Sequence, residues 1–593
     1  MSGKSFVILT FQVPEESTLY PEPRKNLIQY PLNHLTGGKS NILYLEKSAI
    51  FISIVRRFIT IFLLISTFLG SAQGTDYLNL FSDRDSYISG ETILLKIFAP
   101  AQEQSGIVHI DLLNPNGKII TGINKRIIDH QADGFIYLPD SLKTGTYLLS
   151  SSTNSNKFIT VRELFVSNRF TGLTGTSSML RASDINPEVE KLADIIVEGV
   201  QNNYKTRERV KIDLRLTSET LTRLEGDLVI SLAEKSPEID AQSFIQSTVS
   251  AKEPKIEKDG IIIEGSVTEL DTNKPFSNGC VYLSVPDSIP KLQYFIPGED
   301  GCFSFHLSGY FGTIPVVIQA FDPEKKRLLK IFLNHRDSLI SAVPKFSNIA
   351  ISAASADFQS AETNNIELTT LRKIFNIQDI TISDTALSRK NDYPFYGRPG
   401  EIIHPNNFIE LPDFTEISRE LLPGVKFRAY NRIPSMQILN PLTQNYFIEQ
   451  PLVLLNGVPV LDLKVIKNLG TKDIERIELC RNERFYGNLA FHGVVAIYTS
   501  KKDLSLLKES DDLVKINLDV LQPQAALNIP KEGKLPNEPD LRKVLLWNPG
   551  LKKAKTIHLE FSTSDVKGSF KLIIRGKTKD GSIIRKDQIF EVK

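Results

Sequence analysis

Residue types that could carry chemistry are spread thinly along this sequence. The eight His residues stand apart, and neither an HExxH motif nor a Cys/His cluster accompanies them, so the sequence predicts no zinc site. No Gly-x-Ser-x-Gly elbow presents a serine nucleophile. The segment Gly37–Ser40 imitates the end of a phosphate-binding loop, but Asn33 stands where such a loop needs its first glycine. We therefore expect a non-enzymatic protein without a cofactor or a metal; an enzyme with a site assembled across domains is the alternative.

Turn-forming carboxylates and the single tryptophan are the next candidates. Asp271, Asp300 and Asp580 lie in turn contexts, where an Asp side chain commonly hydrogen-bonds the backbone, and calcium binding is the alternative. Trp547 is interpreted as a core anchor, with a ligand platform as the alternative. Both interpretations favour structural roles.

The overall composition excludes several classes of protein. The chain has 593 residues, of which 41% are hydrophobic and 23% charged, so it holds enough apolar mass for several cores. Lys and Arg number 70 against 69 Asp and Glu, a formal net charge of +1, which argues against a nucleic-acid-binding protein with its basic excess. Three Cys residues exclude a disulfide-dense scaffold.

One apolar segment has the features of an export signal. An Arg-Arg pair precedes the apolar run 58–70, and small residues follow up to Ala72, which is the pattern of a secretory signal peptide. The run is shorter than the ~20 apolar residues that span a bilayer, and a buried helix is the alternative. We predict a signal peptide over 54–72, cleaved near Ala72, with 1–53 as a gene-model extension or a disordered segment. The exported protein is expected in the periplasm or peripherally on the outer membrane.

Short alternating apolar runs, broken by Gly, Asn-Pro and Asp-Gly, dominate the rest of the sequence. They predict a mainly β chain of tandem β-sandwiches, the first of them over 73–169. The residues Asp85-Ser-Tyr87-Ile-Ser-Gly90-Glu91, Leu138-Pro139 and Gly145-Thr-Tyr147 resemble the macroglobulin-like family. The resemblance implies a β-sandwich of the Ig and macroglobulin type.

One phrase of this first sandwich recurs. Tyr87-x3-Glu91 and the alternating apolar residues after it match Tyr204-x3-Glu208 position by position, and repeats of domain size indicate a tandem array. The alternative is that two amphipathic strands merely share a period of two. We expect a linker over 170–194 that ends in a short helix, and then a second macroglobulin-like sandwich over 195–250.

A third sandwich is expected over 258–345. Its residues Gly265-Ser-Val267, Pro275, Gly279 and Asp300-Gly301-x-Phe303 resemble the carboxypeptidase-regulatory-like (transthyretin-like) family, whose modules are structural or binding pieces. Cys280 and Cys302 fall on runs that could be neighbouring strands, so they are candidates for a disulfide in an exported chain, and two free thiols are the alternative. A small and polar linker is expected over 346–412.

The most specific pattern lies at 413–503. A helix stopped by Pro423-Gly424 precedes a strand, and Asn456-Gly457 is a strong hairpin signal. Five groups of residues complete the pattern: Leu455-Asn-Gly457-Val-Pro459, Ile466 with Leu469, Asp473-Ile-Glu-Arg-Ile477-Glu478, Tyr486-Gly487 and Gly493-Val-Val-Ala-Ile497-Tyr-Thr499. Together they resemble the plug domain of TonB-dependent outer-membrane receptors. The resemblance implies a small α/β fold. Fewer than a hundred residues follow, too few for a receptor barrel, and a terminal β-sandwich is expected over 515–593.

These expectations combine into a binding or structural role. We expect an exported envelope protein, associated with the outer membrane, whose partner is another envelope protein and not nucleic acid. The alternative is an accessory of a TonB-dependent nutrient uptake system, with the outer-membrane barrel protein on another chain. Partner-binding residues are expected in the plug-like domain at Asn456, Gly457, Tyr486, Gly487 and His492, with purely structural turns as the alternative.

Overall fold

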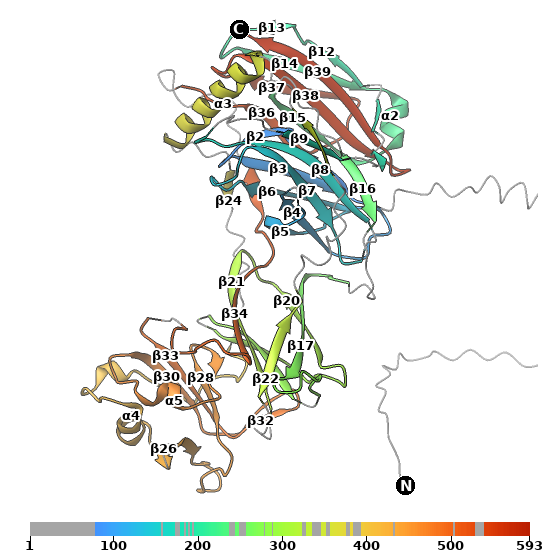
Figure 1. The fold of residues 1–593 in the computed structure, drawn as a ribbon. Helices are drawn as coiled ribbons and strands as arrows, with labels where there is room; N and C mark the ends of the chain where they lie inside the picture. Colours follow the sequence, from blue (N-terminus) through green and yellow to red (C-terminus); the bar gives the residue numbers. More distant parts are fainter. Residues whose placement is uncertain are drawn as a thin grey trace, which may run out of the picture. The chain divides into compact units, whose positions relative to one another are not determined.

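The computed structural model is mainly β, as the alternating apolar runs predicted (Figure 1). The structure describes residues 77–593 apart from 115, 156–157, 172–177, 183–185, 188–189, 193–194, 236–242, 248–255, 278, 288, 323–327, 335–345, 351–355, 375–379, 383–392, 431–432, 502–503 and 528–538. The predicted signal peptide and the segment before it lie outside the described residues. Among the helices described, none is long and apolar enough to cross a membrane.

The first sandwich consists of two sheets around one apolar core. One sheet has the order β1 (Asn79–Ser82), β3 (Thr92–Phe98), β6 (Gln131–Tyr137). The other has the order β8 (Phe158–Ser167), β7 (Gly145–Ser152), β4 (Ile107–Leu113), β5 (Ile119–Arg126), with β2 (Ser86–Ile88) parallel to β8. Beyond β8 the second sheet continues with β16 (Ser243–Ser247) and β10 (Asn186–Pro187). Strand β3 is buried on both faces, because Ile93 and Leu95 enter this core while Leu94 and Phe98 pack outward.

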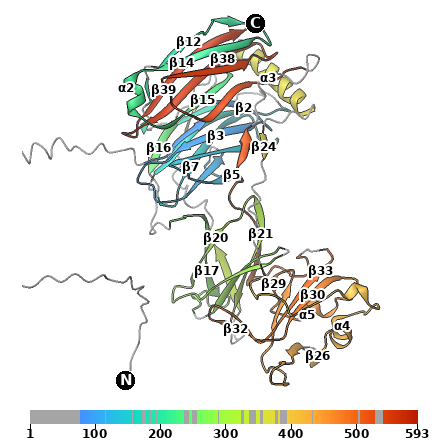
Figure 2. The same cartoon turned by 180° about the vertical axis from the view of Figure 1, so that it is seen from behind.

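The second sandwich repeats this topology strand for strand (Figure 2). One sheet has the order β12 (Ile195–Glu198), β14 (Arg209–Leu216), β37 (Thr556–Ser562). The other has the order β39 (Ile583–Val592), β38 (Gly568–Thr578), β15 (Leu224–Glu234), β36 (Val544–Leu551), with β13 (Asn203–Tyr204) parallel to β39. The short helix α2 (Ser218–Arg223) joins β14 to β15. Each strand thus has its equivalent in the first sandwich.

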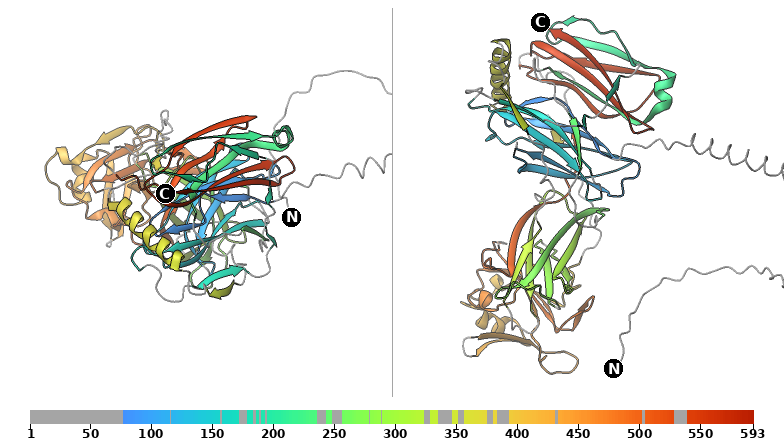
Figure 3. Two further views of the ribbon diagram at one scale, coloured as in Figure 1. Left: turned by 90° about the horizontal axis from the view of Figure 1, so that it is seen from above. Right: turned by 45° about the vertical axis from the view of Figure 1, so that its right-hand side comes forward.

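This arrangement corrects the predicted domain boundaries. The expected sandwiches over 195–250 and 515–593 are two halves of one domain, and both halves contribute strands to each of its two sheets (Figure 3). The connection between β15 and β36 spans some 300 residues. Its equivalent in the first sandwich, between β4 and β5, is a tight turn in which the Gly117 N–H donates to the Asn114 carbonyl at 2.9 Å. The remaining domains are therefore inserted at one hairpin of the second sandwich.

The recurring Tyr-x3-Glu phrase has the same local structure in both sandwiches, so the predicted repeat is confirmed. The Tyr87 hydroxyl accepts from the Arg84 N–H at 3.2 Å, and the Tyr204 hydroxyl accepts from the Gln201 N–H at 2.8 Å. Glu91 accepts from the N–H of residue 88 at 2.9 Å, and Glu208 accepts from that of residue 205 at 2.7 Å. The phrase therefore encodes the turn that leads into the third strand of each sandwich.

An apolar interface joins the two sandwiches. Its buried members are Phe81, Leu94, Phe98 and Phe135 from the first sandwich and Val229, Trp547 and Ile583 from the second. The expected core role of Trp547 is confirmed, since its side chain is 6% exposed in this interface. In the 170–194 linker the described residues form no helix, and β11 (Glu190–Leu192) instead pairs with β39.

The third sandwich is built from β17 (Gly260–Glu269), β20 (Cys302–Ser308) and β22 (Leu329–Leu333) in one sheet, and from β18 (Cys280–Val285), β19 (Lys291–Phe295), β21 (Thr313–Phe321) and β34 (Leu513–Asp519) in the other. Strand β34 lies far outside the predicted 258–345 and returns to pair with β21. The disulfide considered for Cys280 and Cys302 is not formed, and both thiols are free. They lie on different sheets, where Cys280 is buried and Cys302 is exposed.

The segment predicted as a linker over 346–412 contains regular structure. It holds β23 (Phe346–Ala350) paired with β9 (Ser178–Ala182), α3 (Ala356–Ile374), β24 (Ile380–Ile382) paired with β35 (Ala525–Leu527), β25 (Glu401–Ile403) and the 3-10 helix η2 (Pro405–Asn407). The sequence shows no clear apolar stripe for α3, whose fully buried residues among 363–373 are Asn365, Thr369 and Arg372.

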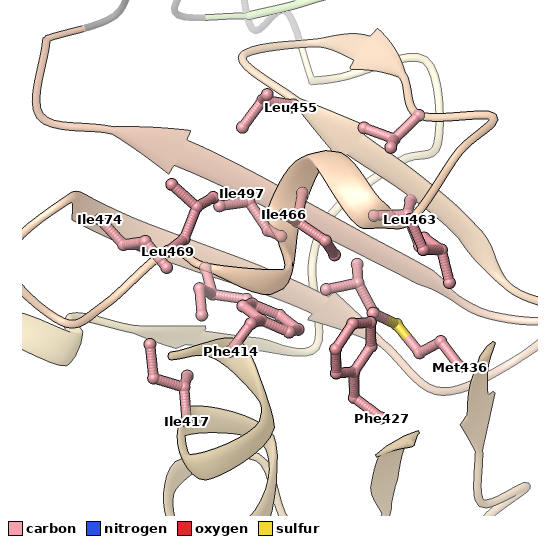
Figure 4. Packing of buried hydrophobic residues seen from close by; sticks show 14 of the residues in the cluster. Phe414, Ile417, Phe427, Met436, Leu455, Leu463, Ile466, Leu469, Ile474 and Ile497 are labelled. Carbon is pink, nitrogen blue, oxygen red and sulfur yellow. The ribbon is translucent and has the colours of Figure 1, made fainter. Parts of the chain in front are cut away.

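The α/β domain covers the plug-like region. Its sheet has the order β25, β30 (Ile474–Cys480), β33 (Val494–Thr499), β28 (Leu452–Leu455), β29 (Val458–Pro459). The hairpins β26 (Val425–Tyr430) with β27 (Ile433–Ile438) and β31 (Arg484–Tyr486) with β32 (Leu489–Phe491), and the helices α4 (Phe414–Leu421) and α5 (Lys464–Lys467), complete it. Phe414, Phe427, Met436 and Ile466 pack together in its core (Figure 4). The predicted helix stop and the predicted hairpin are confirmed, since α4 ends before Gly424.

Candidate interaction site

The Asn456-Gly457 turn faces the third sandwich. Both residues have positive φ, +50° and +87°, which a two-residue hairpin turn requires. The Asn456 amide donates to the Thr499 hydroxyl and accepts from the Thr499 N–H, each at 2.8 Å. A Cβ added at Gly457 would lie 2.5 Å from the Cβ of Pro290. The turn is thus part of an intramolecular junction.

Tyr486 and Gly487 contact the same sandwich. The Tyr486 hydroxyl donates to the Leu292 carbonyl, and its ring lies edge-on to Tyr294 with centroids 5.9 Å apart. The Asn488 N–H donates to the Tyr294 hydroxyl at 2.8 Å, an approach that a side chain at Gly487 would block. Gly457, Tyr486 and Gly487, three of the five residues expected to bind a partner, therefore lie against another domain of the same chain. Asn456 holds its turn through Thr499 of its own domain.

His492 lies apart from that junction. Its Nε2 is 3.3 Å from the Glu483 carboxylate, and its ring is 5.3 Å from that of Phe447. The side chain is 26% exposed. His492 therefore lies beside the protruding loop that contains Phe447.

This loop, residues 440–448, carries the most exposed large apolar side chains of the described chain. Leu442 is 88% exposed and Ile448 is 89% exposed. Hydrogen bonds fix the loop backbone: the Asn440 side chain accepts from the Leu442 N–H at 2.9 Å, and the Phe447 N–H donates to the Ile438 carbonyl at 3.0 Å. This loop was not identified from the sequence. An apolar Leu within the polar turn sequence Asn-Pro-Leu-Thr-Gln-Asn could have indicated an exposed apolar side chain.

A cluster of buried charges joins the first and second sandwiches to α3. Lys543 donates to the Glu91 carboxylate at 3.1 Å, to the Asn365 carbonyl at 3.0 Å and to the Thr369 hydroxyl at 2.9 Å. Thr369 in turn donates to Glu91 at 2.9 Å, and Arg84 is 3.4 Å from the other Glu91 oxygen. Because the ammonium group of the second sandwich has one acceptor in the first sandwich and two in α3, the cluster ties these three parts of the chain together.

The two glutamates of this cluster differ in their electrostatics. Burial alone would raise the pKa of Glu91, but Arg84, Lys543, the Ile88 N–H and Arg372 outweigh it and hold that pKa well below its usual value. Burial raises the pKa of Glu234, and the opposing effects of Lys543 and Arg84 do not cancel it. Glu91 is thus stabilised as a carboxylate and Glu234 is not.

A second polar junction connects the first and third sandwiches. The His109 ring lies 2.6 Å from the Glu257 carboxylate through Nε2 and 2.6 Å from the Asn124 side-chain oxygen through Nδ1. The Asn124 amide donates to the Asp519 carbonyl at 2.8 Å, and the Gln522 N–H donates to the Asn124 carbonyl at 2.8 Å. Glu257 lies on one chain segment that joins these sandwiches, and Asp519 and Gln522 lie on the other. Both segments therefore meet around the buried His109 and its partner Asn124.

A substitution at Gly457 tests the contact between this turn and the third sandwich. Gly457→Ala combines positive-φ strain with the clash against Pro290, so we expect it to destabilise the α/β domain by about 2–4 kcal/mol. Gly397→Ala is the matched control, because its φ is +81° but an added Cβ meets nothing within 4 Å, and about 1–2 kcal/mol is expected. Native-state hydrogen exchange in β28 measures both losses, and equal losses would contradict the junction.

Comparison with known proteins gives only distant similarities. No protein-family model and no curated protein sequence matches the chain. Similar solved structures include trypsin-activated alpha-2-macroglobulin from Escherichia coli, at 11% identity and a TM-score of 0.21, covering 88% of this chain and 42% of that one. Methylamine-reacted alpha-2-macroglobulin from Salmonella has 10% identity and a TM-score of 0.20, with 88% and 40% covered. The adhesin InvE of Yersinia pseudotuberculosis has 10% identity and a TM-score of 0.13, with 44% and 60% covered.

This chain therefore spans about two fifths of the length of the two macroglobulins. Similarity at these TM-scores carries no functional argument. The structure itself shows the predicted tandem array in its two topologically equivalent β-sandwiches, each with the same Tyr-x3-Glu turn.

Proposed function

We propose that this chain is an exported, non-enzymatic envelope protein that acts as a binding and structural module associated with the outer membrane. The signal-peptide pattern at 54–72 supports export, with cleavage near Ala72. Glu91 accepts from Lys543, and Glu234 accepts from Asn365, so both carboxyl groups make contacts between parts of the chain, which supports a structural role.

The exposed loop of the α/β domain is the observation that carries this proposal. Leu442 and Ile448 project from a backbone that is already fixed, so contact with a partner would bury apolar surface at little cost in chain ordering. Exposed apolar side chains of this kind mark protein interaction sites when they lie together on one surface. The proposed partner is another protein of the envelope.

The resemblance of the α/β domain to a receptor plug supports a second candidate function. The hairpin at Asn456-Gly457, the short helix α5 and the strands β30 and β33 follow one another in the order that the resemblance implies. In this alternative the chain is an accessory of a TonB-dependent uptake system, and its α/β domain contacts an outer-membrane barrel on another chain.

Site-specific photo-crosslinking in the intact envelope tests the proposal. A photoreactive residue at 442 or 448 is expected to give one discrete adduct with an envelope protein, and a barrel protein in that adduct would favour the accessory role. The matched control is Ile196, which is 53% exposed on the second sandwich and is expected to give no such adduct. A soluble monomer without an adduct at 442 or 448 would overturn the proposal.

A further inference from the structure

Helix α3 lies against the first and second sandwiches (Figure 1), and the fully buried side chains among its residues 363–373 are polar. Asn365, Thr369 and Arg372 are buried, Leu368 packs partly buried against the second core, Ile366 is half-buried, and Leu371 is 40% exposed. A surface helix ordinarily docks through an apolar stripe. The docking of α3 therefore depends on the charged and polar groups beneath it.

The two glutamates beneath α3, Glu91 and Glu234, differ in the cations that lie close to them. Glu91 lies within 3.1 Å of Lys543 and 3.4 Å of Arg84. The Glu234 carboxylate instead accepts two hydrogen bonds from the Asn365 amide, at 3.1 and 2.9 Å in the amide orientation that satisfies both groups. The charged groups around it are Asp83, Arg84 and Glu91 from the first sandwich, Lys543 from the second, and Arg372 from α3, while Lys373 of α3 pairs with Asp140 at 3.4 Å.

We propose that α3 is a strap whose docking across the two sandwiches is coupled to the uptake of a proton from solvent at Glu234. A neutral carboxyl group still accepts from Asn365 and no longer repels Glu91. An ionised carboxylate must be desolvated without a direct cationic partner. The proposal goes beyond partner binding, since it concerns how the chain holds its own domains together.

The direction of the pH effect follows from this linkage. Burial raises the pKa of Glu234 in the docked state, so docking is favoured at acidic pH and weakens as the pH rises through that value. If the pKa of Glu234 differs by one unit between the docked and the undocked state, the docking equilibrium changes about tenfold between low and high pH. Burial also raises the pKa of Asp83, but its side chain contacts Arg84, Tyr87 and the Leu94 N–H of its own sandwich, so its titration is not tied to α3.

Hydrogen exchange of the full chain tests the proposal. Protection of the amides at 363–373, corrected for the intrinsic exchange rate, is expected to be about tenfold higher at about pH 5 than at about pH 8. Glu234→Gln is expected to remove this dependence and to keep the protection high at both pH values. Glu219→Gln, an exposed carboxylate on α2, is the matched control and is expected to behave as the unmodified chain.

A second variant works in the opposite direction. Asn365→Asp places a carboxylate against Glu234, so protection at about pH 8 is expected to fall at least about tenfold below that of the unmodified chain. Equal protection at both pH values in the unmodified chain would overturn the proposal. So would a Glu234→Gln chain that keeps the original pH dependence.

Discussion

A Glu91→Gln chain is expected to lose about 3–5 kcal/mol of the free energy that holds the first and second sandwiches together. Its carboxylate accepts from Lys543, from Thr369 and from the Ile88 N–H, and it faces Arg84. A neutral amide would leave the buried Lys543 ammonium without its paired carboxylate, and Arg84 would keep only Asp83 as a counter-charge. Trp547 is the only tryptophan and lies in the sandwich interface, so its fluorescence during urea unfolding reports this loss directly.

The control is the equivalent residue of the second sandwich. Glu208 accepts from the Lys205 N–H at 2.7 Å in the same turn but is not part of the buried cluster. Glu208→Gln is therefore expected to cost about 1 kcal/mol or less. Similar losses in both variants would show that the turn, and not the charge cluster, supplies the stability.

The effect of Glu91 should also depend on pH. Because its pKa is lowered in the folded chain, its contribution is fully present above the pKa of the unfolded chain and is lost as the pH falls toward the folded value. The difference between the Glu91→Gln chain and the unmodified chain should thus shrink below about pH 4. A difference that stays constant into acid would contradict the charge assignment.

Local features of this fold were predictable because few neighbouring residues determine them. The Tyr-x3-Glu turn closes its hydrogen bonds within four residues, and the Asn456-Gly457 hairpin requires only positive φ at two positions. The division of the second sandwich was not predictable in this way. Leu232 pairs with Leu546 on one side and with Leu572 on the other, and neither half shows which remote strand completes its sheet.

The candidate site was only partly predictable for a related reason. A hairpin signal is the same whether the turn faces solvent or a neighbouring domain, so Gly457 and Tyr486 could not be assigned to the junction with Pro290 and Leu292. The buried cluster also escaped prediction, because Glu91, Asn365 and Lys543 come from three distant segments and each resembles an ordinary surface residue in its local sequence.

The last prediction concerns the second sandwich, whose strands come from both sides of the inserted domains. When a protease site engineered between Leu527 and Pro539 is cleaved, we expect the C-terminal fragment to stay bound to the rest of the chain. Strand β15 of the N-terminal fragment pairs with β36 and β38, and β14 pairs with β37, so the fragment supplies half of one core. Size-exclusion chromatography of the cleaved protein is expected to show a single species that separates only in denaturant.

Expression without the fragment completes the test. A chain ending at Leu527 would leave β13 and β15 without their partner strands and β14 without β37, and it would expose Phe81 and Phe98 at the sandwich interface. We expect this chain to lose hydrogen-exchange protection in β14 and β15 and to aggregate, because an uncovered apolar face beside unpaired strand edges favours association. An independent terminal sandwich over 515–593 requires the opposite result: separation after cleavage and an intact second sandwich without the fragment. The two outcomes therefore decide whether the second sandwich is one domain interrupted by the others.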